Sequence, residues 1–352
     1  MTLLAVADMP PVDEGDAPRH VPVLLNEVLE HLAPRAGEVH VDATFGAGGY
    51  ARAILRAADV RLFGIDRDPA AIAGGQALAA TYPDRLTLLH GRFSEMEALL
   101  AALGVRSVDG VVMDLGVSSM QLDEAARGFS FMQEGPLDMR MEAEGLSAAE
   151  VVNSFREEDI AAILKAYGEE RRARPIARAI ARRRKEQPFA TTFDLVEVVE
   201  QVLGRPRPGK KHPATRTFQA LRIFVNRELE EVARGLLAAE RLLRPGGRLV
   251  VVSFHSLEDR IVKQFFKVRT GRGEAASRRL PHEPEPPSPT FIDLAPGGVV
   301  PSEEEVARNP RARSARLRAG RRTDAPAISD MPPLPGGRQG SGGERRKRGR
   351  RH

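Results

Sequence analysis

Apolar and polar positions alternate along the chain in a pattern that predicts a regular order of strands and helices. Short apolar or β-branched runs occupy residues 39–42, 60–66, 86–93, 108–116 and 248–255. Segments with helical composition separate the first four runs, so strand and helix follow each other in turn. This order predicts an α/β fold with a parallel, doubly wound sheet. Ligands of such sheets bind beyond the carboxyl ends of the strands.

The strand rhythm stops after about residue 123 and resumes near residue 248. Helical patterns fill the interval, which we interpret as an insertion between the fourth and fifth strands. The expected helices are two over 147–167, a basic one over 169–186, one over 194–203 and a long one over 217–243. We expect a loop over 270–290 and closing strands within 291–317. The predicted units are a disordered tail 1–18, a sheet domain of 19–124 and 212–320, an inserted helical domain 125–211 and a disordered Arg-rich tail 321–352.

Charge and composition narrow the possible classes of protein. The net charge of +5 over 352 residues comes from residues 341–352, which hold six basic residues and one acidic residue. Binding of nucleic acid must therefore rest on local clusters of cations. The absence of cysteine excludes disulfides, zinc–thiolate sites and thiol nucleophiles, and suits a reducing cytoplasm. No apolar run of ~18 residues predicts a membrane span, and the first residues do not resemble a secretory signal.

A glycine-rich turn follows the first predicted strand. Residues 46–51 read Gly-Ala-Gly-Gly-Tyr-Ala, which fits the G-x-G-x-x-G/A pattern of dinucleotide sites. S-adenosylmethionine is the other candidate ligand. It has no phosphate, and needs close approach of the backbone, a carboxylate for the ribose and an apolar wall for the adenine. Asp66, at the end of the second strand, and Phe93, at the end of the third, supply the last two.

Longer blocks favour the methyl donor. They begin with Asp-Leu-Gly-Val-Ser-Ser over 114–119 and continue at 127–132, 135–141, 167–171, 211–222 and 253–260. In this order they closely resemble the ribosomal RNA small subunit methyltransferase H family, whose bacterial members methylate the exocyclic amine of a cytosine in 16S rRNA. The resemblance covers roughly residues 20–320. It implies a class I methyltransferase (Rossmann-like) fold with an inserted helical domain, S-adenosylmethionine as cofactor, and 16S rRNA within the small ribosomal subunit as partner.

The resemblance also implies which residues contact the cofactor. They are Gly48, Gly49, Tyr50, Asp66, Phe93, Asp114 and Gln121. The family usually has histidine at the position of Tyr50, so the role of this side chain is open.

Methylation of an amine requires a nucleophilic nitrogen aligned with the methyl group. The lone pair of the cytosine amine is delocalised into the ring, and an acceptor that binds an amine hydrogen helps to localise it. We hypothesise that Asp114 binds the amine or positions the donor, with Ser118 or Ser119 nearby, and pure cofactor binding by Asp114 is the alternative. His212 and His255 are candidates for catalysis or for capping. No dedicated metal site is expected. Binding of a magnesium ion that is shared with RNA phosphates is an alternative that the sequence leaves open.

Several groups of residues suggest contact with RNA. Arg171, Arg174, Arg178 and Arg182 fall along one face of the predicted basic helix, and Lys210, Lys211 and Arg216 form a second patch. A solvated face paired with acidic residues is the other reading of the helix. Phe129 and Phe131 are candidates for stacking on the base or for core packing, and Ser256 with Asp259 fits a helix-capping box. The Arg-rich tail is expected to add nonspecific affinity. Two other functions stay open, an NAD-dependent oxidoreductase and a noncatalytic ribosome assembly factor.

Overall fold

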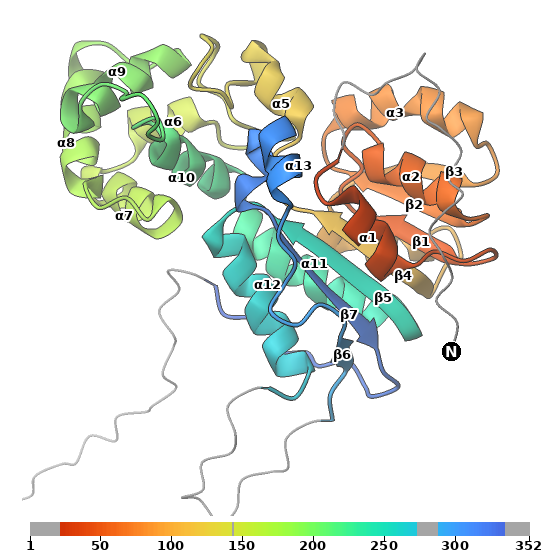
Figure 1. The fold of residues 1–352 in the computed structure, drawn as a ribbon. Coiled ribbons are helices and arrows are strands. Elements are labelled where there is room, and N and C mark those ends of the chain that lie inside the picture. Colours follow the sequence, from red (N-terminus) through yellow and green to blue (C-terminus); the bar gives the residue numbers. More distant parts are fainter. Residues whose placement is uncertain (1–21, 143, 273–287, 335–352) are drawn as a thin grey trace, which may run out of the picture.

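A computed structural model describes residues 22–142, 144–272 and 288–334. Its centre is a seven-stranded sheet in the order β3-β2-β1-β4-β5-β7-β6 (Figure 1). The strands are β1 (Val39–Asp42), β2 (Arg61–Asp66), β3 (Leu86–His90), β4 (Val108–Asp114), β5 (Leu243–Ser253), β6 (Phe291–Asp293) and β7 (Arg316–Arg322). The first five are parallel, while β7 is antiparallel to β5 and β6 is antiparallel to β7. This topology is that of the class I methyltransferases, so the predicted fold is confirmed.

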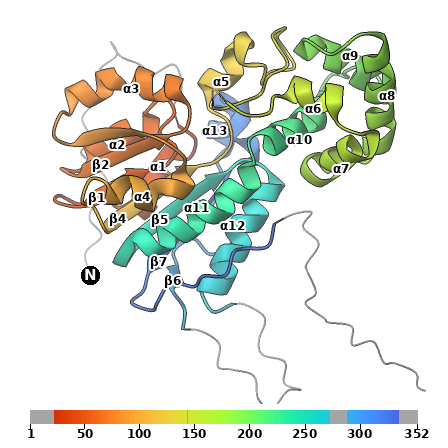
Figure 2. The same cartoon turned by 180° about the vertical axis from the view of Figure 1, so that it is seen from behind.

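Helices cover both faces of the sheet and give it two apolar cores. On one face lie α1 (Leu25–Leu32), α2 (Gly49–Ala57) and α3 (Pro69–Thr81). On the other lie α4 (Met96–Ala101), α11 (Glu228–Leu242) and α12 (Ser256–Arg269). Figure 2 shows α4 and α11 across this second face. The central strands β4 and β5 are buried on both faces, which explains their nearly continuous apolar sequence.

A separate helical unit lies beside the sheet (Figure 1). It contains α6 (Ala148–Ser154), α7 (Glu157–Gly168), α8 (Ala173–Glu186), α9 (Thr192–Leu203) and α10 (Thr215–Val225), which share a third apolar core. Helix α10 packs against α7, although the sequence assigned it to the sheet domain. We refer to these five helices as the helical unit.

The long helix expected over 217–243 is wrong, because α10 and α11 are two helices. They are separated by Asn226 and by Arg227, which has a left-handed backbone with φ of 49°. The Asn226 side chain donates to the carbonyl of Met139 (2.7 Å) and accepts from the N–H of Met141 (2.8 Å). Its own carbonyl accepts from Arg67 of the sheet domain (3.0 Å). The interruption therefore ties the helical unit to the sheet domain.

The basic helix predicted over 169–186 also differs from α8. Helix α7 continues to Gly168 and ends with Glu169 in a left-handed conformation (φ 49°), and α8 begins only at Ala173. Arg171 therefore precedes the helix, whereas Arg174, Arg178 and Arg182 share its exposed face. The predicted row of four arginines is reduced to three.

The C-terminal part of the chain is more ordered than predicted. Strand β7 extends to Arg322, and residues 323–334 follow it along the sheet domain. Arg269, 1% exposed, pairs with the fully buried Glu240 (3.1 Å) and donates to the carbonyls of Ile328 (2.9 Å) and Asp330 (2.7 Å). These buried hydrogen bonds hold a segment whose composition alone indicated disorder. The remaining predicted tail beyond 334, the tail 1–18 and most of the loop 270–290 lie outside the described residues.

None of the helices in the described ranges combines the length and the apolar character that a membrane crossing needs.

Candidate active site

A cleft of about 1180 Å³ opens at the carboxyl ends of the parallel strands. Its wall on the side of the helical unit includes Met141 and Arg222. The cleft brings together the predicted residues Gly49, Tyr50, Asp66, Phe93, Asp114, Ser118 and Gln121. Gly48 is in the adjoining turn, and Ser119 is the first residue of α5 (Ser119–Asp123), with a side chain outside the described part of the structure.

Close packing explains the glycines of the turn. Gly48 has φ of 74°, and a Cβ there would lie 2.9 Å from the ring of Phe45. A Cβ on Gly49 would overlap the ring of Pro22. The turn is also held by Asp66, whose carboxylate accepts from the N–H groups of Gly46 (2.8 Å) and Asp68 (2.8 Å). Burial raises the pKa of Asp66 above its ordinary value, although these two N–H groups oppose the change.

Gln121 belongs to a buried polar network. Its Nε2 donates to Asp68 Oδ2 (2.8 Å), and Arg127 pairs with the same oxygen (2.8 Å). Its Oε1 accepts from the N–H of Ser118, while the Ser118 hydroxyl accepts from the N–H of Gln121. Ser118 thus caps α5, and both amide atoms of Gln121 already have protein partners. Asp68 and Arg127 were not among the predicted site residues, although Asp68 before Pro69 is a recognisable helix-capping pattern.

Phe93 forms an apolar wall of the cleft. It begins a 3-10 turn after β3 and faces Gly235 of α11, where any Cβ would overlap its ring. The next residue, Ser94, is fixed through its N–H (2.9 Å) and its hydroxyl (3.0 Å) by the carboxylate of Glu231. This wall can take a flat apolar ring.

Two carboxyl groups at this strand edge, Asp42 and Asp114, have no cationic partner within the described part of the chain. Asp42 is fully buried, and burial raises its pKa from 3.8 to about 7, with Asp66 adding to the effect. Burial, with Asp42 and Glu258 nearby, holds the pKa of Asp114 well above its ordinary value. Asp42 Oδ2 and Asp114 Oδ1 are buried, and none of the residues that the structure describes forms a hydrogen bond with either oxygen. A carboxyl-rich edge of this kind suits a ligand that carries positive charge.

Comparison with known proteins decides the family. A model of the MraW methylase family matches residues 17–323, most of the chain. The chain belongs to the MraW methylase family.

Its relatives in this family are similar over nearly their whole lengths. A protein named ribosomal RNA small subunit methyltransferase H from Nitrobacter hamburgensis is 59% identical over 318 residues, which are 90% of this chain and 95% of the relative. A protein of the same name from Methylobacterium nodulans is 57% identical over 336 residues, or 92% and 98% of the two chains. A solved rRNA methylase from Streptococcus thermophilus has a TM-score of 0.37 and 9% identity, over 85% of this chain and 94% of that one.

Within this MraW-family fold, Tyr50 has a structural contact of its own. The side chain is 4% exposed, and its hydroxyl donates to the carbonyl of Val23. Burial raises the pKa of Tyr50 well above its ordinary value, so the phenol stays neutral. The ring therefore anchors the segment before α1 against the glycine turn.

Three of the predicted aromatic and histidine candidates lie away from the cleft. Phe131 stacks on His212 with ring centroids 4.8 Å apart, and His212 Nε2 is 3.3 Å from Glu200. Phe129 is 5% exposed and belongs to the core of the helical unit. Both phenylalanines and His212 thus have packing roles.

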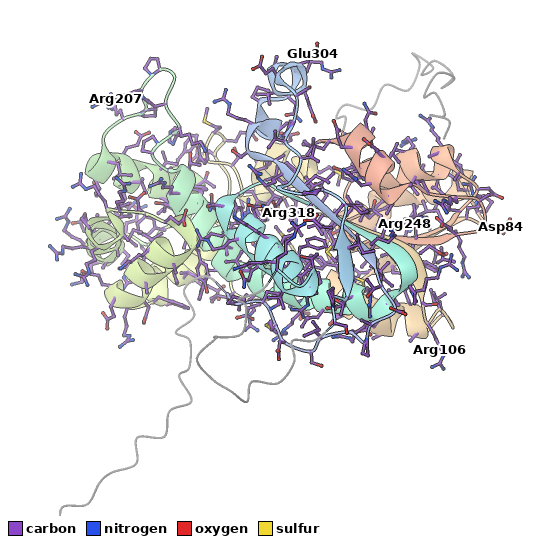
Figure 3. All side chains as sticks on the ribbon, turned by 60° about the horizontal axis from the view of Figure 1, so that its bottom comes forward. Asp84, Arg106, Arg207, Arg248, Glu304 and Arg318 are labelled. Carbon is purple, nitrogen blue, oxygen red and sulfur yellow. The ribbon has the colours of Figure 1, made fainter. Side chains whose placement is uncertain are left out.

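The helix cap predicted from Ser256 and Asp259 is wrong by one residue. The cap of α12 is His255 with Glu258, while Asp259 pairs with Arg318 of β7 (2.7 Å), which is labelled in Figure 3. Sequence spacing alone could not distinguish the two registers, because histidine is an unusual capping residue. The correction puts His255 and Glu258 in the wall of the cleft.

The pKa of Asp42 predicts a pH-dependent stability. A carboxyl group whose pKa is raised in the folded state favours folding at low pH, and this contribution is lost as the pH rises from 3.8 through about 7. Asp42→Asn removes the dependence, because the amide imitates the neutral acid. Its free energy of unfolding should gain about 2–3 kcal/mol over the wild type between pH 5 and pH 8. Urea unfolding of the ligand-free proteins measures the difference, and parallel pH profiles would contradict it.

Proposed function

We propose that this protein transfers a methyl group from S-adenosylmethionine to the N4 amine of a cytidine in 16S rRNA of the small ribosomal subunit. The observation that supports it best is the Asp114 carboxyl group at the cleft of an MraW-family fold, because its buried Oδ1 has no hydrogen-bond partner in the described ranges. Relatives of similar length are named for methylation of small-subunit rRNA. The reaction belongs in the cytoplasm, in keeping with a chain without cysteine.

The residues of the cleft fit S-adenosylmethionine. Gly48 and Gly49 allow the tight turn that borders the cleft. Asp66 offers a carboxylate at the end of β2, and Phe93 offers an apolar wall for the adenine. Asp114 lines the cleft, and its Oδ1 has no hydrogen-bond partner among the described residues, which suits a molecule with sulfonium and ammonium charges, while the fully buried Asp42 lies behind the lining. When bound, the cofactor supplies an electrophilic methyl group. Gln121 acts in the proposal by holding Asp68 and the start of α5.

Asp114 has the chemistry that an amine methylation needs. Its Oδ1 accepts one hydrogen of the cytosine amine, which localises the nitrogen lone pair toward the methyl group. The N–CH₃ bond forms as the CH₃–S bond breaks, and the surplus proton of the amine passes to Asp114. The positive charge of the bound cofactor would favour the ionised carboxylate, and the burial that raises the pKa of Asp114 makes this carboxylate a stronger base than that of an ordinary aspartate. Ser118 caps α5 and fixes the loop after β4 in this scheme.

The helical unit provides the surface for RNA. Arg174, Arg178 and Arg182 line a small groove on α8. Lys211 belongs to the exposed loop before α10, whose tip carries the labelled Arg207 in Figure 3. Arg216 donates to the carbonyl of Glu169 (3.2 Å), and the Glu169 carboxylate accepts from Ser256 at the start of α12 (3.1 Å). Together with Arg171, these cations offer phosphate contacts from α8 toward the cleft.

One experiment tests the function directly. The protein is incubated with radiolabelled S-adenosylmethionine and small subunits that lack the modification, and the rRNA is digested to nucleosides. The expected product is N4-methylcytidine, formed with one S-adenosylhomocysteine per methyl group. Binding to small subunits without any methylated nucleoside would instead identify a noncatalytic assembly factor. Methylation of another base would reject the cytidine assignment.

Neutralising the arginines of α8 should weaken RNA binding in a salt-dependent way. In an Arg174→Gln/Arg178→Gln/Arg182→Gln variant, the slope of log Kd against log salt should fall by about 2, because each lost phosphate contact removes about 0.7–0.9. Binding to small subunits is measured by filter retention between low and physiological salt.

A matched control uses Arg56→Gln, Arg61→Gln and Arg106→Gln, three exposed arginines on the sheet domain at the amino ends of the strands. Its slope should equal that of the wild type. If the slope fell equally in the two triple variants, the effect would come from net charge alone and not from phosphate contacts of α8.

A further inference from the structure

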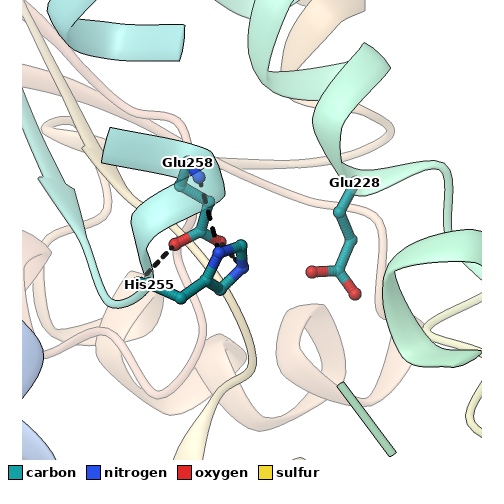
Figure 4. Close-up of side chains that lie close together, drawn as sticks. All are labelled: Glu228, His255 and Glu258. Atoms are coloured by element: carbon teal, nitrogen blue, oxygen red, sulfur yellow. Dashed lines mark hydrogen bonds and ion pairs between the residues drawn. The ribbon is translucent and has the colours of Figure 1, made fainter. Parts of the chain in front are cut away.

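His255 and Glu258 begin α12 directly after β5, and both side chains line the cleft. Figure 4 shows them together, with Glu228 of α11 pointing toward them. Glu258 is fully buried, and the side chain of His255 is 12% exposed. Neither has a role in the methyl transfer described above.

The cap of α12 determines which nitrogen of His255 carries a proton. His255 Nδ1 accepts from the backbone N–H of Glu258 (3.4 Å), so Nδ1 has a free lone pair and no proton. A neutral imidazole then has its proton on Nε2. This N–H is buried in the wall of the cleft and lies 3.1 Å from Glu258 Oε1, but it makes no aligned hydrogen bond among the described residues. His255 thus offers a donor to the cleft.

Glu258 offers an acceptor beside that donor. Its Oε2 accepts from the N–H groups of Phe254 (3.0 Å) and His255 (3.3 Å), which fixes the carboxylate. Its Oε1 is buried, lies 3.1 Å from His255 Nε2, and is without a hydrogen bond in the described structure. Burial raises the pKa of Glu258, but the facing His255 Nε2–H, the Arg222 guanidinium and the N–H of Phe254 outweigh burial and hold the pKa below its ordinary value, so the group is ionised. A donor and an acceptor are therefore fixed side by side.

A metal ion is the other occupant that these side chains suggest. One potential ligand atom from each of Glu228, His255 and Glu258 lies within 4.8 Å of the others. The Glu228 carboxylate, however, accepts two hydrogen bonds from Arg222 (2.9 and 2.8 Å), and the positive guanidinium opposes a cation there. Protonated Nε2 has no lone pair to give. The arrangement favours a polar ligand with both an acceptor and a donor.

We propose that His255 and Glu258 recognise the Watson–Crick edge of the target cytosine. His255 Nε2–H donates to ring nitrogen N3, and Glu258 Oε1 accepts one hydrogen of the adjacent amine, while Asp114 accepts the other. Uracil has an N–H at N3, which would face the His255 donor, and a carbonyl oxygen in place of the amine, which would face the Glu258 carboxylate. Both contacts would be repulsive, so the pair selects cytosine over uracil. A base read in this way must leave its stack to enter the cleft. The inference rests on the proposed function and specifies how its substrate base is selected.

Two substitutions at His255 separate the donor from the helix cap. Asparagine and aspartate both cap helices well, but only asparagine keeps an N–H donor. His255→Asp should lower kcat/KM for small subunits by about 100-fold or more, and His255→Asn by about tenfold. Affinity for S-adenosylhomocysteine, measured by calorimetry, and the thermal midpoint should stay near the wild-type values for both. Glu258→Gln turns an amide N–H toward the amine, so its kcat/KM should be lowered as much as that of His255→Asp.

A substrate analogue tests the contact without changing the fold. Small subunits are reconstituted with 3-deazacytidine at the target position, which retains the amine and lacks the N3 acceptor. The kcat/KM of the wild type should be about tenfold lower or more on this substrate than on normal subunits. The kcat/KM of His255→Asp should be the same on both substrates, because this variant has already lost the contact. The proposal would be overturned if His255→Asp were as active as the wild type on unmodified subunits. It would also be overturned if 3-deazacytidine lowered the kcat/KM of the two enzymes by the same factor. Activity that a chelator abolishes and a divalent ion restores would overturn it as well.

The wild-type reaction on unmodified subunits distinguishes the two levels of inference. If it forms no methylcytidine, both the proposed function and this inference fail. If it forms methylcytidine and the His255 variants match it, only the base-recognition role fails.

Discussion

Asp114→Asn is expected to lower the rate of methyl transfer by about 100–1000-fold, the usual cost of removing a catalytic proton acceptor. The amide cannot take the amine proton, and its rotation can present an N–H to the substrate where an acceptor is needed. Asp114 N–H donates to the Thr44 hydroxyl (2.6 Å), and this backbone contact is independent of the side chain. The fold around β4 should therefore stay intact.

The measurement is a single-turnover assay with small subunits, combined with calorimetric binding of S-adenosylhomocysteine. Affinity within about tenfold of wild type, with the large loss of rate, assigns Asp114 to the chemistry. An exposed control is Asp84→Asn between α3 and β3, labelled in Figure 3, which should behave as wild type. Full turnover of Asp114→Asn would exclude the catalytic role, and a loss confined to affinity would make Asp114 a cofactor ligand only.

Arg269→Met should destabilise the protein by about 3–5 kcal/mol, because it leaves a buried carboxylate without its cation. Glu240 is fully buried, and besides Arg269 its carboxylate accepts only from Thr290 (2.6 Å) and the N–H of Ile328 (3.3 Å) among the described contacts. Its backbone carbonyl accepts from Arg322 (3.0 Å). The substitution also leaves the carbonyls of Ile328 and Asp330 without this donor. Release of residues 323–334 from the sheet domain should accompany the loss.

Urea unfolding at neutral pH measures the difference. Arg272→Met is the matched control, since Arg272 is 61% exposed and its pair with Asp293 should contribute less than about 1 kcal/mol. Removing both buried charges, in Arg269→Met/Glu240→Leu, should restore much of the stability. A single Arg269→Met variant as stable as Arg272→Met would show that the pair contributes little.

The strands could be predicted because their signal is local. Each parallel strand is a short apolar run, and β1 and β4 each end in an acidic residue whose place at the edge follows from the topology. The break between α10 and α11 is different. Asn226 leaves the helical pattern because residues far earlier in the chain, Met139 and Met141, bind its side chain. The hydrophobic periodicity of the surrounding sequence contains no signal of such a long-range contact, so the break could not be predicted.

The same distinction holds for the site: residues at strand ends could be predicted, whereas contacts that depend on packing could not. Asp66, Phe93 and Asp114 could be assigned to one edge from strand ends alone. The pairing of His255 with Glu258 depends on the register of a helix start, which the sequence left ambiguous by one residue. That Asp114 Oδ1 is buried without a hydrogen-bond partner from the described residues depends on three-dimensional packing, which no local sequence pattern contains.

The position of β4 has a consequence for synthesis on the ribosome. β4 pairs with β5, yet the whole helical unit is translated between them. At ~5–20 residues per second, the apolar edge of β4 waits on the order of ten seconds for its partner strand. During that time the helical unit can complete a core of its own, which brings its two ends together and shortens the remaining search. Slow codons or core mutations within the helical unit should therefore lower the yield of folded protein through β4, a strand that they never touch.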